Sequence, residues 1–174
     1  MSSDGIDLLV QKKTIDNLGN LSINKNTTIN IPKNIGINDS VVDLDLRNFK
    51  SNPYSSYSDT IVKSDILSFS IKKDNSDKLE IKDTEEPFIL KLNVKRENGI
   101  LPVTSCNFWN NTLNSWSSNG CKASQYEGDN LVCLCNHLTD FSSTRPNYNA
   151  VDPIGDFSKL SNISWNNLTT ITTL

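Results

Sequence analysis

The stretch from Cys106 to Phe141 decides how this chain is interpreted. It reads C-N-F-W over residues 106–109, W-S-S-N-G-C over 116–121 and C-L-C-N-H-L-T-D-F over 133–141. It holds all four cysteines, the single histidine and two of the three tryptophans. Residue types that are scarce in the rest of the chain lie together here at fixed spacing, as a cross-linked and chemically specialised hairpin requires.

The cysteines allow several interpretations: two disulfides, a zinc site that includes His137, or redox thiols. Structural zinc sites usually draw ligand pairs spaced C-x(2–4)-C, whereas Cys133 and Cys135 have only one residue between them. In a strand both would point to one face, which suits cross-links to a neighbouring segment. No C-x-x-C redox motif is present. The spacing therefore favours two disulfides, and four cysteines allow three pairings.

Trp109, Trp116 and Gly120 have a structural interpretation. We expect the two indoles to pack over the disulfides as part of the core, because aromatic rings supply large apolar contact areas. Gly120 is expected to supply a turn just before Cys121, since glycine adopts turn conformations that other residues avoid. These residues are interpreted as scaffold, and we expect neither a metal nor a cofactor at this site.

Composition limits the classes of function. The chain has 174 residues, of which 36% are hydrophobic, and a mean hydropathy of −0.42, which suits one domain with a modest core. Its net charge of −3 comes from interspersed charges of both signs, so no basic stripe offers itself to nucleic acid. No apolar run approaches the roughly 20 residues of a membrane-spanning helix. The run from Leu8 to Val10 is too short for a signal peptide. If the cysteines are oxidised, we expect the chain to be an excerpt of a longer protein.

Several N-x-S/T sequons permit N-glycosylation. They begin at Asn20, Asn26, Asn38, Asn110, Asn162 and Asn167. The chain is so rich in Asn, Ser and Thr that about five such matches are expected by chance alone. The sequons therefore allow a secreted glycoprotein without arguing for one.

Alternating apolar and polar residues upstream of this stretch predict β-strands. Val42, Leu44 and Leu46 alternate with charged residues, as in a strand with one buried face. Further strands are predicted over residues 61–72, 79–81 and 88–94. Strands at spacings of about 10 residues, without a helical period, favour an antiparallel sandwich. The prediction is an all-β antiparallel sandwich that ends in a disulfide-stapled hairpin.

The chain divides by composition into three parts. Residues 1–40 are polar, and fragments of alternation at 29–31 and 35–37 predict only short edge strands there. Residues 41–145 form the predicted sandwich, which includes the cysteine-rich stretch. Residues 146–174 carry two prolines among many polar residues, so we expect a linker or tail.

His137, Leu138 and Thr139 are the candidate reactive residues. In an extended strand, residues 137 and 139 lie on one face with the Leu138 carbonyl between them. The Thr139 hydroxyl could attack that carbonyl while the His137 imidazole, whose ordinary pKa is about 6.5, accepts the proton. An N-to-O acyl shift would give an ester, which water then cleaves. The shift is unfavourable for a relaxed amide, so disulfides at Cys133 and Cys135 would have to pin the bond.

The residues of this stretch together resemble a known motif. They are Cys106, Phe108, Trp109, Trp116, Gly120, Cys121, Cys133, Cys135, His137, Leu138, Thr139 and Phe141. The pattern is similar to the GPS motif, the G-protein-coupled-receptor proteolytic site, within the GAIN domain of adhesion receptors and polycystin-like proteins. The motif covers residues 106–141, and residues 60–94 resemble the strands of the GAIN β-sandwich subdomain more loosely. The helical subdomain that often precedes it is not evident in the sequence.

The resemblance implies autoproteolysis between Leu138 and Thr139, with Thr139 as nucleophile and His137 as base. The reaction acts once within the chain and turns over no external substrate. The two fragments are expected to stay associated without a covalent bond, so the C-terminal fragment is the first partner. A position on the extracellular face of a membrane-spanning receptor with a signalling role is also implied, whereas the ligand of such a receptor is not.

The same resemblance implies disulfides between Cys106 and Cys133 and between Cys121 and Cys135. One feature departs from adhesion receptors, in which the strand after the cleaved bond is a largely apolar tethered agonist. Here T-D-F-S-S-T-R-P over residues 139–146 is polar, which favours a polycystin-like or unclassified parent. A non-cleaving structural or adhesion module and a small zinc protein are the alternatives.

Overall fold

The computed structural model describes residues 5–37, 41–73 and 78–145, which form eleven strands and one short 3-10 helix. The elements are β1 (Ile6–Thr14), η1 (Ile15–Asn17), β2 (Asn20–Asn24), β3 (Thr27–Asn30), β4 (Val41–Phe49), β5 (Ile66–Lys72), β6 (Phe88–Asn93), β7 (Ser105–Asn110), β8 (Ser115–Ser117), β9 (Cys121–Glu127), β10 (Asn130–Cys135) and β11 (Asp140–Thr144). The predicted all-β class is confirmed.

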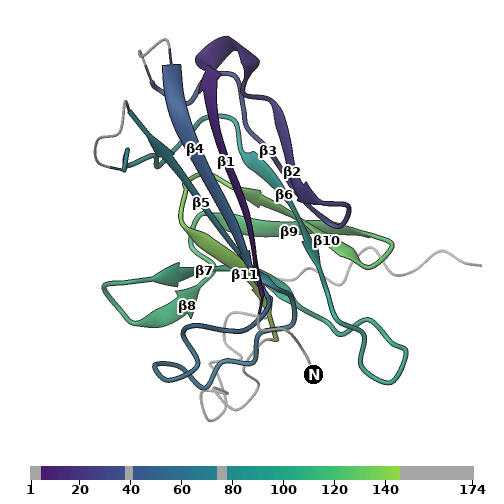
Figure 1. Cartoon of the computed structure of the whole chain (residues 1–174). Helices are drawn as coiled ribbons and strands as arrows, with labels where there is room; N and C mark the ends of the chain where they lie inside the picture. The colour runs from purple at the N-terminus through teal and green to yellow at the C-terminus, as the bar shows by residue number, and fades with distance from the viewer. Residues whose placement is uncertain (1–4, 38–40, 74–77, 146–174) are drawn as a thin grey trace, which may run out of the picture.

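The strands form two antiparallel sheets that face each other (Figure 1). One sheet has six strands in the order β1-β4-β5-β11-β7-β8, and the other has five in the order β2-β3-β6-β10-β9. The last strand of the described chain, β11, therefore lies inside the six-stranded sheet, between β5 and β7. This arrangement is the predicted sandwich, with the cysteine-rich stretch at its C-terminal part.

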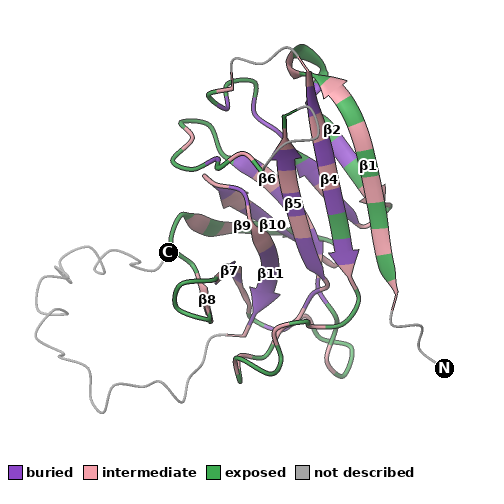
Figure 2. Cartoon of the chain, turned by 60° about the vertical axis from the view of Figure 1, so that its left-hand side comes forward, coloured by how far each residue is buried: buried purple, intermediate pink, exposed green. Residues whose placement is uncertain are grey.

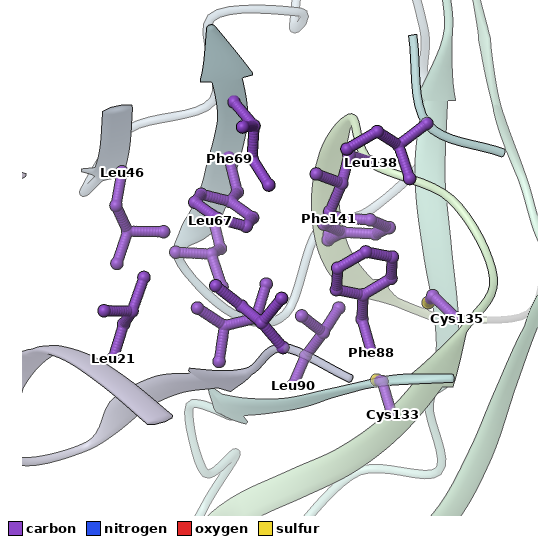
Figure 3. Close-up of a cluster of buried hydrophobic side chains, with 14 of the residues drawn as sticks. Leu21, Leu46, Leu67, Phe69, Phe88, Leu90, Cys133, Cys135, Leu138 and Phe141 are labelled. Atoms are coloured by element: carbon purple, nitrogen blue, oxygen red, sulfur yellow. The ribbon is translucent and has the colours of Figure 1, made fainter. Parts of the chain in front are cut away.

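The core lies between the two sheets and follows the alternation of the sequence. Val42, Leu44 and Leu46 on β4 are at most 1% exposed. Phe88 and Leu90 on β6, in the other sheet, are fully buried, and Phe88 lies beside Phe141 in the core (Figure 3). Each such side chain contributes about 1.5–3 kcal/mol when it leaves water. Figure 2 shows β11 as buried along nearly its whole length, while buried and partly exposed residues alternate along β5.

The N-terminal part of the chain differs from the sequence prediction. The composition set residues 1–40 apart from the sandwich, but β1, β2 and β3 belong to its two sheets. β1 pairs with β4 along nine residues, from Ile6 opposite Phe49 to Thr14 opposite Val41. Its alternation is hidden in the sequence because the solvent face is also apolar, with Leu8 60% exposed. The edge strand predicted over 29–31 corresponds to β3, which lies inside its sheet between β2 and β6.

Three of the strands predicted from the sequence differ in the structure. Residues 35–37 and 79–81 form no strand, although Ile35 and Ile81 are buried in the core, because single buried side chains on irregular segments mimic alternation. The strand predicted over 61–72 begins only at Ile66. The tail predicted over residues 146–174 lies outside the described residues.

Candidate functional site

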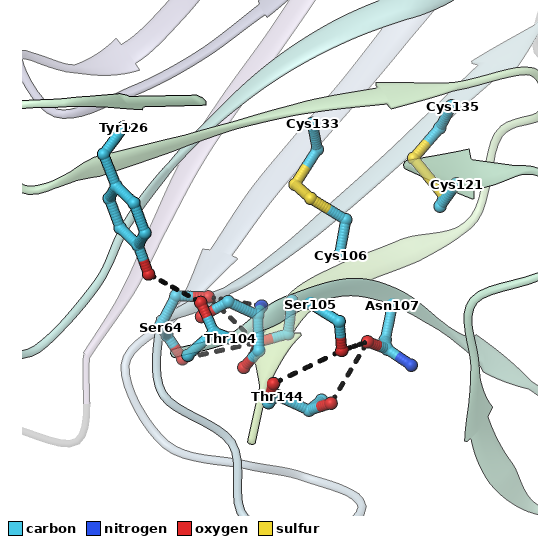
Figure 4. Close-up of a disulfide and its surroundings, with 12 residues drawn as sticks. Ser64, Thr104, Ser105, Cys106, Asn107, Cys121, Tyr126, Cys133, Cys135 and Thr144 are labelled. Carbon is cyan, nitrogen blue, oxygen red and sulfur yellow. Dashed lines mark hydrogen bonds between the residues drawn. A yellow bond between two sulfur atoms is a disulfide. The ribbon is translucent and has the colours of Figure 1, made fainter. Parts of the chain in front are cut away.

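Two disulfides fix the part of the sandwich that precedes β11 (Figure 4). Cys106 on β7 is bonded to Cys133 on β10, with their Cα atoms 5.8 Å apart, so this bond joins the two sheets. Cys121 on β9 is bonded to Cys135 on β10, its partner in the same sheet, at a Cα separation of 4.2 Å. These are the pairs that the resemblance implies. All four thiols are used, which leaves none of them to bind zinc as a thiolate.

His137, Leu138 and Thr139 lie where the chain crosses from one sheet to the other. β10 ends at Cys135 in the five-stranded sheet, and β11 begins at Asp140 in the six-stranded sheet. The three residues were expected in an extended strand, but the structure places them in this crossover. Because packed sheets lie about 10 Å apart, residues 136–139 must turn through the edge of the core over a short length.

The residue before the histidine is hydrogen-bonded on both of its peptide groups. The Asn136 amide donates to the Gly120 carbonyl at 3.0 Å. The Asn136 carbonyl accepts from the Thr84 amide at 3.0 Å and from the Thr84 hydroxyl at 3.2 Å. Two separate segments, one before β9 and one between β5 and β6, therefore hold the start of the crossover.

The residues on both sides of the Leu138–Thr139 peptide bond are held by backbone hydrogen bonds. The Leu138 amide donates to the Ile81 carbonyl at 3.0 Å, and the Thr139 carbonyl accepts from the Phe69 amide at 3.2 Å. The Leu138 side chain is anchored in the core at 8% exposure (Figure 3). Within the described residues, the Leu138 carbonyl and the Thr139 amide have no hydrogen-bond partner outside regular strand pairing. Within the described residues no donor therefore stabilises the Leu138 carbonyl oxygen, on which negative charge would develop during the predicted attack.

His137 packs between two phenylalanines beside the second disulfide. Its ring meets Phe108 edge-on at a centroid distance of 4.4 Å and stacks over Phe141 at 5.7 Å. Its Nε2 lies 3.3 Å from the Asn119 carbonyl oxygen and 4.0 Å from Cys121 Sγ. A carbonyl can only accept, so the Asn119 contact places a proton on Nε2 and leaves the Nδ1 lone pair free in the neutral ring.

The surroundings of His137 favour this neutral form. Burial lowers the pKa of His137 below its ordinary value, because the charged imidazolium loses hydration. The Asn119 carbonyl and the Asp83 carboxylate oppose the shift but do not cancel it. At neutral pH the ring is therefore a base with an available lone pair.

The Thr139 hydroxyl is directed to a different group. Its Oγ1 donates to the Trp109 carbonyl at 3.4 Å. No hydrogen bond between the described residues joins His137 to Thr139. The predicted base and nucleophile are therefore two residues apart in the chain but are not hydrogen-bonded to each other. Catalytic hydrogen bonds often form only in the reacting geometry, and a turn of the threonine side chain about χ1 redirects its hydroxyl.

Comparison with known proteins gives the family. The model of the GPS family described as GAIN subdomain B matches residues 3–143. The chain belongs to this family. The zebrafish Gpr126/Adgrg6 extracellular region has the same fold over 78% of this chain and 22% of its own, with a TM-score of 0.54 and 18% identity.

One curated relative is an adhesion receptor by name, and another is a latrophilin. Human adhesion G protein-coupled receptor F5 is 38% identical over 63 residues, which cover 34% of this chain and 5% of the receptor. Latrophilin Cirl of Drosophila persimilis is 36% identical over 83 residues, which cover 47% of this chain and 4% of the latrophilin. This GAIN subdomain B thus matches a small part of much longer proteins. In its described residues no helix has the length and hydropathy to cross a membrane.

Gly120 has a second role in this GAIN subdomain B beyond the turn that the sequence predicts. Its φ is +75°, which confirms the turn conformation. A Cβ atom added there would lie 2.4 Å from Asn136 Oδ1 and 3.0 Å from His137 Cδ2. The glycine therefore leaves the space in which Asn136 and His137 sit, a close approach that no sequence pattern shows.

The two indoles pack differently from the expectation. Trp109 and Trp116 meet edge-on at 5.6 Å, and Tyr54 stacks on Trp109 at 4.2 Å. Trp109 is buried at 3% exposure, as expected of a core residue, but the core cluster that contains Cys106 and Cys133 includes neither indole. The indoles thus form an aromatic group with Tyr54 instead of a cover over the disulfides, and Tyr54 had no signal in the sequence beyond its place in a proline-containing loop.

Proposed function

We propose that this GAIN subdomain B is a self-cleaving module on the extracellular side of a membrane receptor-like protein, and that it cleaves between Leu138 and Thr139. The observation that carries the proposal is the position of that peptide bond. It lies in the crossover between the sheets, is held at Leu138 and Thr139 by backbone hydrogen bonds, and has the single histidine of the chain beside it. Holding reacting groups in place is one of the largest contributions that a protein makes to such a step.

The reaction uses only groups of the chain and one water molecule. Thr139 Oγ1 attacks the Leu138 carbonyl carbon, and its proton passes to Nδ1 of neutral His137. The C–N bond then breaks, the Thr139 nitrogen takes up the proton, and an ester joins Leu138 to the Thr139 oxygen. Water hydrolyses the ester to a Leu138 carboxylate and a free Thr139 hydroxyl behind a new N-terminal amine. The first requirement is that the hydroxyl leave the Trp109 carbonyl.

The position of β11 supports continued association of the two fragments. Phe141 is 1% exposed in the core, and Ser142 and Ser143 are fully buried. β11 pairs with β7 over four residues on one side. On the other side it pairs with β5, and beyond it Lys63 donates its amide to the Ser143 carbonyl at 2.8 Å. A strand with partners on both edges separates only if both ladders open, so we infer that cleavage leaves the C-terminal fragment in the sheet.

The proposed location follows from the disulfides and the relatives. Disulfides persist in oxidising compartments and are rare in the cytosol. The named relatives are adhesion receptors and a latrophilin. A membrane-spanning parent with a signalling role is part of the proposal, because this chain covers only a small part of those proteins.

A non-cleaving structural or adhesion module is the second candidate. It is favoured by one observation, that the Thr139 hydroxyl bonds to the Trp109 carbonyl while His137 Nε2 bonds to the Asn119 carbonyl. The same disulfides and the same buried β11 would serve such a module.

The experiment that separates the two is production of the chain through a secretory pathway, followed by denaturing electrophoresis. Self-cleavage predicts fragments 1–138 and 139–174, with a new N-terminus at Thr139 by mass spectrometry. Thr139→Ala should abolish cleavage and His137→Ala should reduce it strongly, because each removes one reacting group. A single intact band for the parent chain, identical to that of Thr139→Ala, would refute self-cleavage and leave the non-cleaving module.

A further inference from the structure

The loop that joins β4 to β5 reaches the residue after the proposed cleavage position. Its first part, residues 51–60, is called the Tyr54 loop below, and it lies at the same end of the sandwich as β7 and β8 (Figure 1). The loop is shaped by its own hydrogen bonds. The Tyr54 amide donates to Asn52 Oδ1 at 2.9 Å, and the Tyr57 amide donates to the Tyr54 carbonyl at 3.0 Å.

Tyr54 makes three contacts that bring this loop onto the site. Its ring stacks on Trp109 with centroids 4.2 Å apart and planes 13° from parallel, and it meets Trp116 edge-on at 5.7 Å. Its hydroxyl donates a hydrogen bond to the Asp140 carboxylate. Burial and then this hydrogen bond raise the pKa of Tyr54, so the phenol remains a donor at neutral pH.

Trp109 links the Tyr54 loop to the nucleophile. Its ring is the surface on which Tyr54 stacks, and its backbone carbonyl accepts the hydrogen bond from the Thr139 hydroxyl. Tyr54 and Trp109 therefore hold two consecutive residues, Asp140 through its carboxylate and Thr139 through its hydroxyl.

The two sides of the Leu138–Thr139 bond have independent anchors. On the N-terminal side, Asn136 and Leu138 are held through Gly120, Thr84 and Ile81. On the C-terminal side, Phe69 holds the Thr139 carbonyl, and Tyr54 holds the first side chain of β11. Asp140 accepts this hydrogen bond through its carboxylate and also has a charge interaction with Arg47. Loss of the tyrosine hydroxyl would remove the hydrogen bond while the rest of β11 stays paired.

We infer that Tyr54 is a positioning residue for self-cleavage, which acts by holding the Asp140 carboxylate directly after the nucleophile. The inference rests on the proposed function. Tyr54 touches none of the reacting atoms; it fixes the segment that carries the nucleophile. A shift of the reacting groups by about 1 Å, caused by a change elsewhere in the structure, can lower a rate by roughly 100-fold. Loss of a hydrogen bond to the residue next to the nucleophile can therefore slow cleavage.

The test compares two tyrosines of the same loop in the secreted chain. Tyr54→Phe keeps the ring stack and removes only the hydroxyl that binds Asp140. Tyr57→Phe is the matched control, because Tyr57 is 67% exposed and contacts the Trp109 ring at 6.4 Å, while its hydroxyl has no partner among the described residues. We expect Tyr54→Phe to slow the appearance of the fragments in a pulse–chase experiment about tenfold, which corresponds to about 1.4 kcal/mol, and Tyr57→Phe to leave it unchanged.

Two further variants separate positioning from a loss of fold. Asp140→Asn retains an acceptor for the tyrosine hydroxyl and should keep much of the rate. Asp140→Ala should slow cleavage as much as Tyr54→Phe, with no further loss in the double variant, because both remove one shared bond. In the uncleaved Thr139→Ala background, Tyr54→Phe should also speed amide hydrogen exchange at Asp140 relative to Tyr57→Phe.

The outcomes distinguish the inference from the function on which it rests. If the parent chain cleaves and Tyr54→Phe cleaves at the same rate, the inference is overturned and self-cleavage stands. If the double variant of Tyr54→Phe and Asp140→Ala cleaves more slowly than either single variant, by the sum of their separate effects on the activation free energy, the bond between Tyr54 and Asp140 is not the cause. The inference is then also overturned. If the parent chain does not cleave at all, self-cleavage fails and takes the inference with it.

Discussion

Replacing Gly120 by alanine should displace His137, and a second glycine provides a matched control. Gly120 and Gly128 both have a positive φ, of +75° and +62°. A Cβ at Gly128 meets nothing within 4 Å, whereas one at Gly120 meets Asn136 and His137. Both alanine variants therefore bear the strain of the left-handed conformation, about 1–2 kcal/mol, and only Gly120→Ala adds a collision.

The size of the collision term follows from what each neighbour can do. The Asn136 amide, 2.4 Å from the added Cβ, is the end of a flexible side chain and can rotate away. The His137 ring, 3.0 Å from the Cβ at its Cδ2, is confined by Phe108 and Phe141 and must shift as a whole. Overpacking of this kind costs about 1–3 kcal/mol. Gly120→Ala should therefore be about 1–3 kcal/mol less stable than Gly128→Ala.

Two measurements check this prediction. Urea unfolding in a Thr139→Ala background gives the difference in stability without a nicked chain. The extent of cleavage with Thr139 restored should fall for Gly120→Ala and stay near that of the parent chain for Gly128→Ala, because only the first moves the imidazole. Equal stability and equal cleavage of the two variants would show that the close approach to His137 has no consequence.

Three other perturbations have defined outcomes. Changing both Cys106 and Cys133 to alanine removes the disulfide that joins the two sheets between positions 27 residues apart in the chain. The free energy of unfolding in urea should fall by about 3–4 kcal/mol; a fall below about 1 kcal/mol would contradict the cross-sheet role. The single histidine should titrate below its ordinary pKa of about 6.5 in proton NMR of the Thr139→Ala chain, because burial lowers the pKa of His137. Since the unfolded chain then binds more protons, the contribution of His137 to stability is present above the unfolded pKa and is lost as the pH falls toward the folded value; a titration above the ordinary value would refute this. Ser64→Ala removes the oxygen that accepts from the Ser143 amide at 2.9 Å and should destabilise β11 by about 1–3 kcal/mol, seen as release of the cleaved fragment at lower urea than from the parent; unchanged release would contradict it.

The sequence predicted those strands along which apolar and polar side chains alternate. β4 and β6 were found because Leu44, Leu46 and Leu90 alternate with polar residues. β1 was missed because Leu8 lies on its solvent face and breaks the alternation. The family and the disulfide pairs came from the motif, not from spacing alone, because three pairings of four cysteines were equally open.

The site was predicted less completely, because much of it is made by the backbone. The contacts of Asn136 with Gly120 and Thr84 use main-chain groups that every residue has, so the sequence carries no sign of them. Tyr54 is far from Asp140 in the chain, and only the folded loop brings them together. The expectation that residues 137 and 139 share a strand face did not anticipate that the chain changes sheets between them.

The place of β11 in the middle of its sheet has a consequence for what happens if the shorter fragment departs. Its removal would divide the six-stranded sheet into two parts, β1-β4-β5 and β7-β8. Each part would have a new edge strand with unpaired amides and carbonyls. The Cys106–Cys133 bond would keep β7 tethered to the opposite layer, so the slot would remain in register instead of collapsing. Such a slot is a template for strand addition, and a vacated subdomain would then recruit any extended peptide whose side chains suit the gap.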